Sequence, residues 1–82
     1  MEDFELSGHT HDVLVERGLS EEWLRRVIEA PDQQWSGDDG NEHYAKAIEE
    51  RQNRIMHVVV NERVQPRRVV TAFLDRRLRK QP

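Results

Sequence analysis

Two runs rich in β-branched residues constrain the fold of this chain most strongly. They are "NRIMHVVVNE", residues 53–62, and "RRVVTAFLDRR", residues 67–77. Val, Ile and Thr have stiff side chains that pack well on a pleated surface, so both runs predict strands. Because each run has apolar residues on both faces, we expect two central strands with one face under helices and the other partly covered. The link "NERVQP" joins them.

The segments before these runs have helical spacing instead. In "SGHTHDVLVERG", the apolar residues recur at helical intervals before Gly18, which is typical of a helix stop. In "LSEEWLRRVIEAPD", Ser20 is placed as an N-cap, Glu21 and Glu22 lie in the first turn, and Pro31 ends the helix. The inward stripe of this second helix is Trp23, Leu24, Val27 and Ile28.

The middle of the chain predicts a hairpin. The turn-rich segment "SGDDGN" separates two short strands at residues 33–35 and 43–48. The segment "DFEL" alternates weakly, as a short first strand does. We therefore predict one α+β domain over residues 1–77, with two N-terminal helices packed on a curved, mainly antiparallel four-stranded sheet, and a frayed tail at residues 78–82. The predicted core is Trp23, Val27, Ile28, Val58, Val60, Val70, Ala72 and Leu74.

Composition limits the chemistry that is open to the chain. A domain of 82 residues buries only about 60 to 65% of its unfolded surface, so its core is thin. The chain has no cysteine, which excludes disulfides, thiol nucleophiles and thiolate metal sites. It has neither an apolar run of membrane-spanning length nor a basic-then-apolar leader, so we expect a cytoplasmic protein. Any catalysis or ligand binding must therefore use His, Lys, Arg, Tyr and carboxylate side chains.

The charges are divided unevenly along the chain. The formal net charge is −3, yet residues 1–50 hold 4 Lys and Arg against 14 Asp and Glu, whereas residues 51–82 hold 9 against 2. Such an asymmetry either neutralises itself inside the fold or leaves a basic face for a polyanion. The sequence leaves both interpretations open.

A family resemblance accompanies these patterns. The frame "H…ERGLSEEWLRRVIEAPD…HYAKAI…RIMHVVVN…RRVVTAFLDRR" resembles the small bacterial and cyanobacterial DUF4258 family, which is similar in turn to RelE/ParE-type and BrnT toxins. The resemblance covers roughly residues 7–77, most of a domain of this length. It implies two helices and a curved antiparallel sheet, and in the toxin relatives an RNA-cleaving or translation-blocking activity carried by basic residues on the sheet.

Metal-free RNA cleavage needs a base for the 2′-hydroxyl, a cation for the phosphate charge and an acid for the leaving oxygen. Strand alternation predicts that Lys46, Arg54 and Arg76 converge at one edge of the sheet, with His9 as their titrating partner. These four are the candidate catalytic residues. We predict that Asp75 binds one neighbouring arginine. The candidate residues for binding RNA or a protein partner are Arg17, Tyr44, Arg68, Arg77, Arg79 and Lys80.

Each of these residues also has a structural interpretation. His9 can cap the first helix, and Lys46 and Arg54 can lie on a wet sheet face. The four histidines are candidate zinc ligands, but no carboxylate lies at the sequence spacing that a zinc site needs. We therefore expect no metal and no cofactor.

Two functions therefore stand side by side. The first is a toxin-like, metal-independent endoribonuclease or translation inhibitor, whose partners are RNA or the ribosome and a small antitoxin protein. The alternative is a non-catalytic module that docks an acidic protein partner on the basic strand end. Self-association of acidic helices with that strand end is a third interpretation.

Overall fold

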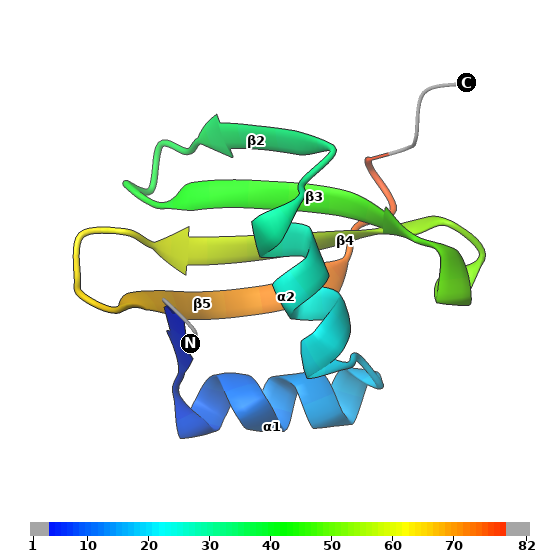
Figure 1. Ribbon diagram of the computed structural model, residues 1–82, viewed down its shortest axis with the longest axis horizontal. Helices are drawn as coiled ribbons and strands as arrows, with labels where there is room; N and C mark the ends of the chain where they lie inside the picture. The colour runs from blue at the N-terminus through cyan, green and yellow to red at the C-terminus, as the bar shows by residue number, and fades with distance from the viewer. Residues whose placement is uncertain (1–3, 79–82) are drawn as a thin grey trace.

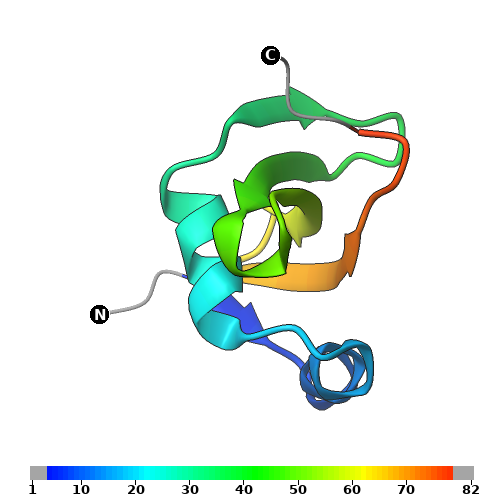
Figure 2. The ribbon, with the colours of Figure 1, turned by 90° about the vertical axis from the view of Figure 1, so that its right-hand side faces the viewer.

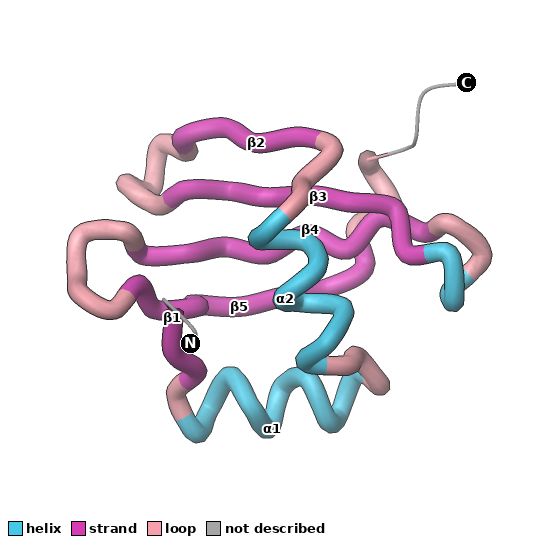
Figure 3. Tube along the Cα trace, in the orientation of Figure 1, coloured by secondary structure: helices cyan, strands magenta, loops and turns pink. Residues whose placement is uncertain are grey.

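Five strands form one mixed sheet, and two helices pack on one of its faces (Figures 1 and 3). The computed structural model describes residues 4–78. The elements, in chain order, are β1 (Phe4–Leu6), α1 (Gly8–Arg17), α2 (Glu21–Glu29), β2 (Gln33–Ser36), β3 (Glu42–Ile48), a 3₁₀ turn (Glu49–Arg51), β4 (Arg54–Asn61) and β5 (Arg67–Leu74). The strand order is β1-β5-β4-β3-β2; β1 is parallel to β5 and the other pairs are antiparallel.

Both predicted helices are confirmed, with the predicted ends. The side chain of Ser7 caps α1, and Gly18 ends that helix in the left-handed conformation, with φ 67°. Ser20 caps α2 by accepting a hydrogen bond from the Glu22 amide at 3.0 Å. That helix stops at Glu29, shortly before the proline. No helix in the described part of the chain is long and apolar enough to cross a membrane.

The core lies between the helices and the sheet. Helix α2 packs across β3 and β4, and α1 packs against β5 and β1. The hydroxyl of Thr10, itself buried, donates to the Val69 carbonyl at 3.0 Å and so fixes α1 to β5. Within residues 4–78 the opposite face of the sheet carries no helix (Figure 2). The core residues are Phe4, Leu14, Leu19, Leu24, Val27, Ile28, Tyr44, Ile48, Met56, Val58, Val60, Val69 and Ala72.

The α+β class is confirmed, but the predicted number of four strands is wrong: the mainly antiparallel sheet has a fifth strand, and its pairing is parallel. The segment Phe4–Leu6 adds a fifth strand, parallel to β5, and Phe4 is buried in the core. A strand this short gains its stability from a neighbour more than 60 positions away, with Phe4 opposite Arg67. The local pattern therefore indicated a strand without indicating the edge that it joins.

A second correction concerns β5, where Val70 is not a core residue. Thr71 pairs with Val59 and Val69 with Val60, which leaves Val70 unpaired in a β-bulge. The bulge directs Val69 into the core, fully buried, while Val70 is 41% exposed. Strand β5 also ends at Leu74, earlier than the predicted 67–77 run.

Candidate functional site

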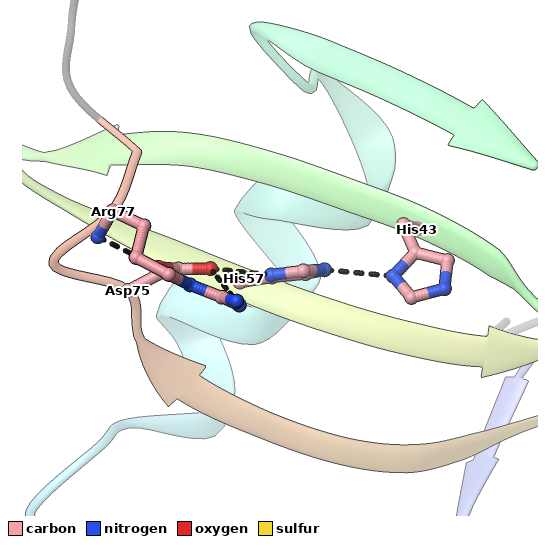
Figure 4. A network of polar contacts seen from close by, with 4 residues as sticks. All are labelled: His43, His57, Asp75 and Arg77. Atoms are coloured by element: carbon pink, nitrogen blue, oxygen red, sulfur yellow. Dashed lines mark hydrogen bonds and ion pairs between the residues drawn. The ribbon is translucent and has the colours of Figure 1, made fainter. Parts of the chain in front are cut away.

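A row of polar side chains crosses the helix-free face of the sheet (Figure 4). His57 on β4 lies opposite Ala45 on β3, so His43, two positions before Ala45, projects from the same face. The Nδ1 atom of His43 is 2.8 Å from Nε2 of His57. The Nδ1 atom of His57 is in turn 2.9 Å from a carboxylate oxygen of Asp75, which follows the end of β5.

Aromatic rings surround the two histidines. Trp35 on β2 stacks on His43, with ring centroids 5.3 Å apart and an interplanar angle of 17°. The centroid of His57 is 5.1 Å from that of Trp35 and 4.9 Å from that of Phe73 on β5. The side chains of His57 and Asp75 are accordingly only 7% and 3% exposed. Because water is largely displaced here, the polar contacts within the row act in a low local dielectric.

Asp75 is the negative end of the row. Burial alone would raise the pKa of its carboxyl group, but hydrogen bonds from His57 and Arg77 outweigh burial and lower that pKa to about 2. The backbone amide of Arg77 donates at 2.9 Å and its Nε at 3.3 Å. The predicted tie between Asp75 and one neighbouring arginine is present, and the arginine is Arg77. Because an ionised carboxylate only accepts, Nδ1 of His57 must carry a proton.

At the other end of the row, His43 meets the turn between β2 and β3. Its Nε2 is 3.2 Å from Oδ1 of Asp39. The amide of Asn41 and then His43 hydrogen-bond to that carboxyl group and lower the pKa of Asp39. A Cβ atom at Gly37 would lie 2.4 Å from Nε2 of His43, so only glycine leaves the histidine ring its present space.

The row has a definite proton requirement. Its three contacts join Asp75 to His57, His57 to His43, and His43 to Asp39, and each contact needs one proton. Two neutral imidazoles supply only two protons, so all three contacts form together only when one of the rings is an imidazolium. Within residues 4–78, no group of three or more His, Asp or Glu side chains is placed to hold a metal ion. The arrangement is suited to accepting and releasing a proton at the sheet surface.

The structure brings together two of the four predicted catalytic residues. Arg54 and Arg76 line one open depression of about 700 Å³ where β4 begins and β5 ends. Lys46 is not among its lining residues. The Nζ atom of Lys46 donates to the Ala30 carbonyl at 2.8 Å, at the end of α2. His9 is exposed on α1 and does not belong to the histidine row.

Several predicted binding residues have partners inside the fold. Arg17 donates to the Ala72 carbonyl at 2.7 Å, and Arg68 pairs with Glu5 at 3.0 Å, a contact that joins the acidic and basic parts of the chain. Arg77 is 83% exposed although it contacts Asp75. The predicted residues Arg79 and Lys80 lie outside the described part of the chain.

Tyr44, another predicted binding residue, is buried in the core under the helices. Its hydroxyl donates to Glu62 and accepts from Arg67 at 3.1 Å. Burial first, and then the bond to Glu62, raise the pKa of Tyr44 to about 12. The tyrosine therefore ties β3 to the link between β4 and β5 and is not accessible to a ligand.

The histidine pair is not predicted as a site from sequence, where His43 and His57 stand out only as zinc ligands. The available signal was strand alternation: once β3 and β4 are aligned with Ala45 opposite His57, both histidines fall on one face. The carboxylate of Asp75 could not be added in this way, since it follows the bulge and the end of β5.

The position of Lys46 leads to a stability prediction. Lys46→Gln removes a cation that neutralises the carbonyl end of α2 and lies 3.5 Å from Asp32, so we expect a loss of about 1 kcal/mol of unfolding free energy. Urea denaturation measures it, and Arg54→Gln, which removes an exposed charge elsewhere on the sheet, is the control. Equal unfolding free energies for both variants would contradict this role of Lys46.

The fold and the site together define a small α+β domain with an acid–base row on its open sheet face. The family described as a domain of unknown function, DUF4258, matches residues 6–74. The chain therefore belongs to the DUF4258 family, as its motifs predicted. No curated protein and no solved structure matches the chain significantly.

Proposed function

We propose that this DUF4258 domain is a toxin-like, metal-independent endoribonuclease related to RelE/ParE-type and BrnT toxins, which blocks translation in the cytoplasm. The observation that carries the proposal is the row from Asp75 through His57 to His43 on an open sheet face. A buried carboxylate that orients one imidazole and, through it, a second is the arrangement that a positioned general base requires.

His43 is the proposed catalytic residue, since its Nε2 is the ring nitrogen of the row nearest the exposed turn. When an RNA strand displaces Asp39, this nitrogen takes the proton of the 2′-hydroxyl while the 2′ oxygen attacks phosphorus. The bond from phosphorus to the 5′ oxygen breaks, water protonates that oxygen, the hydroxide so formed takes the proton back from His43, and a 2′,3′-cyclic phosphate and a 5′-hydroxyl result. Arg77 offsets the negative charge on the phosphate, and His57 and Asp75 are positioning residues.

The test is cleavage of a labelled single-stranded RNA by the purified protein in a chelator. We expect products that end in 2′,3′-cyclic phosphate and 5′-hydroxyl, and no cleavage of the corresponding DNA. His43→Ala is expected to lower the rate by about 100-fold or more, the usual contribution of a positioned base. His57→Gln is expected to shift the pH profile of the remaining activity, because it interrupts the link to Asp75.

His11→Ala is the matched control, because His11 is an exposed histidine on α1 that lies 3.5 Å from Glu21 and outside the row. Thermal unfolding of each variant separates loss of activity from loss of fold. Induced expression should arrest growth, and His43→Ala should relieve the arrest. Full cleavage by a folded His43→Ala protein would disprove the assignment of the base.

A second candidate function is the docking of an acidic protein segment, such as part of an antitoxin. The specific observation for it is the pair of exposed arginines, Arg54 and Arg76, at one end of the sheet. Charge pairing of this kind favours fast, salt-sensitive association. A wild-type protein that cuts no RNA but binds an acidic partner with an affinity reduced by Arg76→Gln would favour this function over the first.

A further inference from the structure

We infer that the depression between the start of β4 and the end of β5 is a phosphate-binding subsite for the RNA strand that is cut at His43, an inference that rests on the proposed function. Arg54 and Arg76 line this depression from two adjacent strand ends. Asp75 is also among its lining residues, and the carboxylate of Asp75 binds His57. The subsite therefore adjoins the Asp75 end of the histidine row.

The two arginines differ from the other basic residues that the structure describes. Within residues 4–78, every other Arg and the Lys takes part in a hydrogen bond or ion pair. Arg54 and Arg76 have no such partner among the described residues, and both are exposed. Two unpaired guanidinium groups in one depression repel each other, and an anion between them removes that repulsion.

Three of the backbone amides around this depression are already engaged. The amides of Gln52 and Asn53 already donate to Glu49 and Ile48 carbonyls, and the Asp75 amide donates to Ile55. Gln52 and Asn53 are both left-handed, with φ values of 56° and 61°. This sharp turn leads directly into Arg54, and Gln52 and Asn53, whose side chains end in amides, line the depression together with both arginines.

A phosphodiester suits these donors well. Guanidinium groups bind phosphate oxygens in a bidentate manner, and amide groups complete the coordination of an oxyanion. The one acidic residue that lines the depression, Asp75, already accepts hydrogen bonds from His57 and Arg77. Bound at this subsite, one phosphate of the strand would fix the register in which a phosphate further along the strand reaches His43.

The experiment measures binding without cleavage. A fluorescent single-stranded RNA carrying 2′-O-methyl groups cannot react, so its affinity reports contacts alone. We expect Arg54→Gln and Arg76→Gln each to weaken binding about tenfold and to reduce the slope of log affinity against log salt by about 0.7, the value for one phosphate contact on a single strand. Arg63→Gln is the control, since Arg63 is an exposed arginine of the β4–β5 turn that is bonded to Asn61.

The outcomes separate the subsite from the proposed function. Equal affinities and salt slopes for Arg54→Gln, Arg76→Gln and Arg63→Gln would overturn the subsite. If inorganic phosphate shifts the NMR signals of residues 52–54 while the RNA does not, the depression binds small phosphates and the strand subsite is wrong. If wild type cuts no RNA but binds it through Arg54, the subsite stands and the ribonuclease proposal fails.

Discussion

Val69→Asp is expected to abolish cooperative unfolding, whereas Val70→Asp is expected to leave a transition close to that of the wild type. Val69 is fully buried against α1 and the neighbouring strands, so an aspartate there places an unpaired charge in the core. A domain of this size is stable by only about 4 to 12 kcal/mol, and burial of an unpaired charge removes several kcal/mol of that stability. Val70 is 41% exposed, so a charge at that position remains hydrated and costs less than about 1 kcal/mol.

Circular dichroism during thermal and urea unfolding measures both variants. The pair is well matched, because the same substitution is made at adjacent positions of one strand. Val69→Ala, which removes volume without adding charge, shows whether loss of packing alone accounts for part of the effect. If Val70→Asp is the variant that unfolds, β5 has no bulge at Val70, opposite Val59 and Val60 of β4, and its side chains alternate regularly between the two faces.

Much of the fold could be predicted from sequence because the signals are local. Caps, a glycine stop and a proline define both helices, and β-branched runs define β4 and β5. Alternation then assigned Val58 and Val60 to the core correctly. It failed at Val70, because a bulge inserts one residue there and exchanges the two faces of the strand, so that Val69 and not Val70 is buried, whereas Ala72 lies in the core as predicted. Nothing local to β5 indicates where the register shifts.

The candidate site was predictable only in part, for the same reason. Arg54 and Arg76 lie near the ends of two neighbouring strands, so alignment of these strands is enough to predict that the two arginines lie close together. The histidine row depends on register across three strands and on a turn, and its members are separated by up to 36 positions from Asp39 to Asp75. Lys46, predicted to join the arginines, is instead bonded to the end of α2, whose position is a property of tertiary packing.

Asp75→Ala is expected to destabilise the domain by roughly 3 kcal/mol, the usual result of removing one partner of a buried polar pair. The substitution leaves Nδ1 of His57 without an acceptor in a site that is 7% exposed. It also removes the acceptor of three donors from Arg77. Asp75→Asn is the matched control, since its amide oxygen can still accept from His57, and we expect it to cost about half as much.

The pH dependence of the stability difference between wild type and Asp75→Asn identifies the charge on Asp75 as the source of that difference. The pKa of this carboxyl group is about 2 in the folded protein and about 3.9 in an unfolded chain, so the unfolded state binds the proton first as pH falls. The stability that ionised Asp75 contributes is therefore complete above about pH 5 and is lost progressively toward about pH 2. The gap in unfolding free energy between wild type and Asp75→Asn, about 1.5 kcal/mol at neutral pH, should therefore close over that range. The other carboxylates are common to both proteins and cancel in the comparison, so parallel curves would mean that His57 and Arg77 do not hold Asp75 in its charged form.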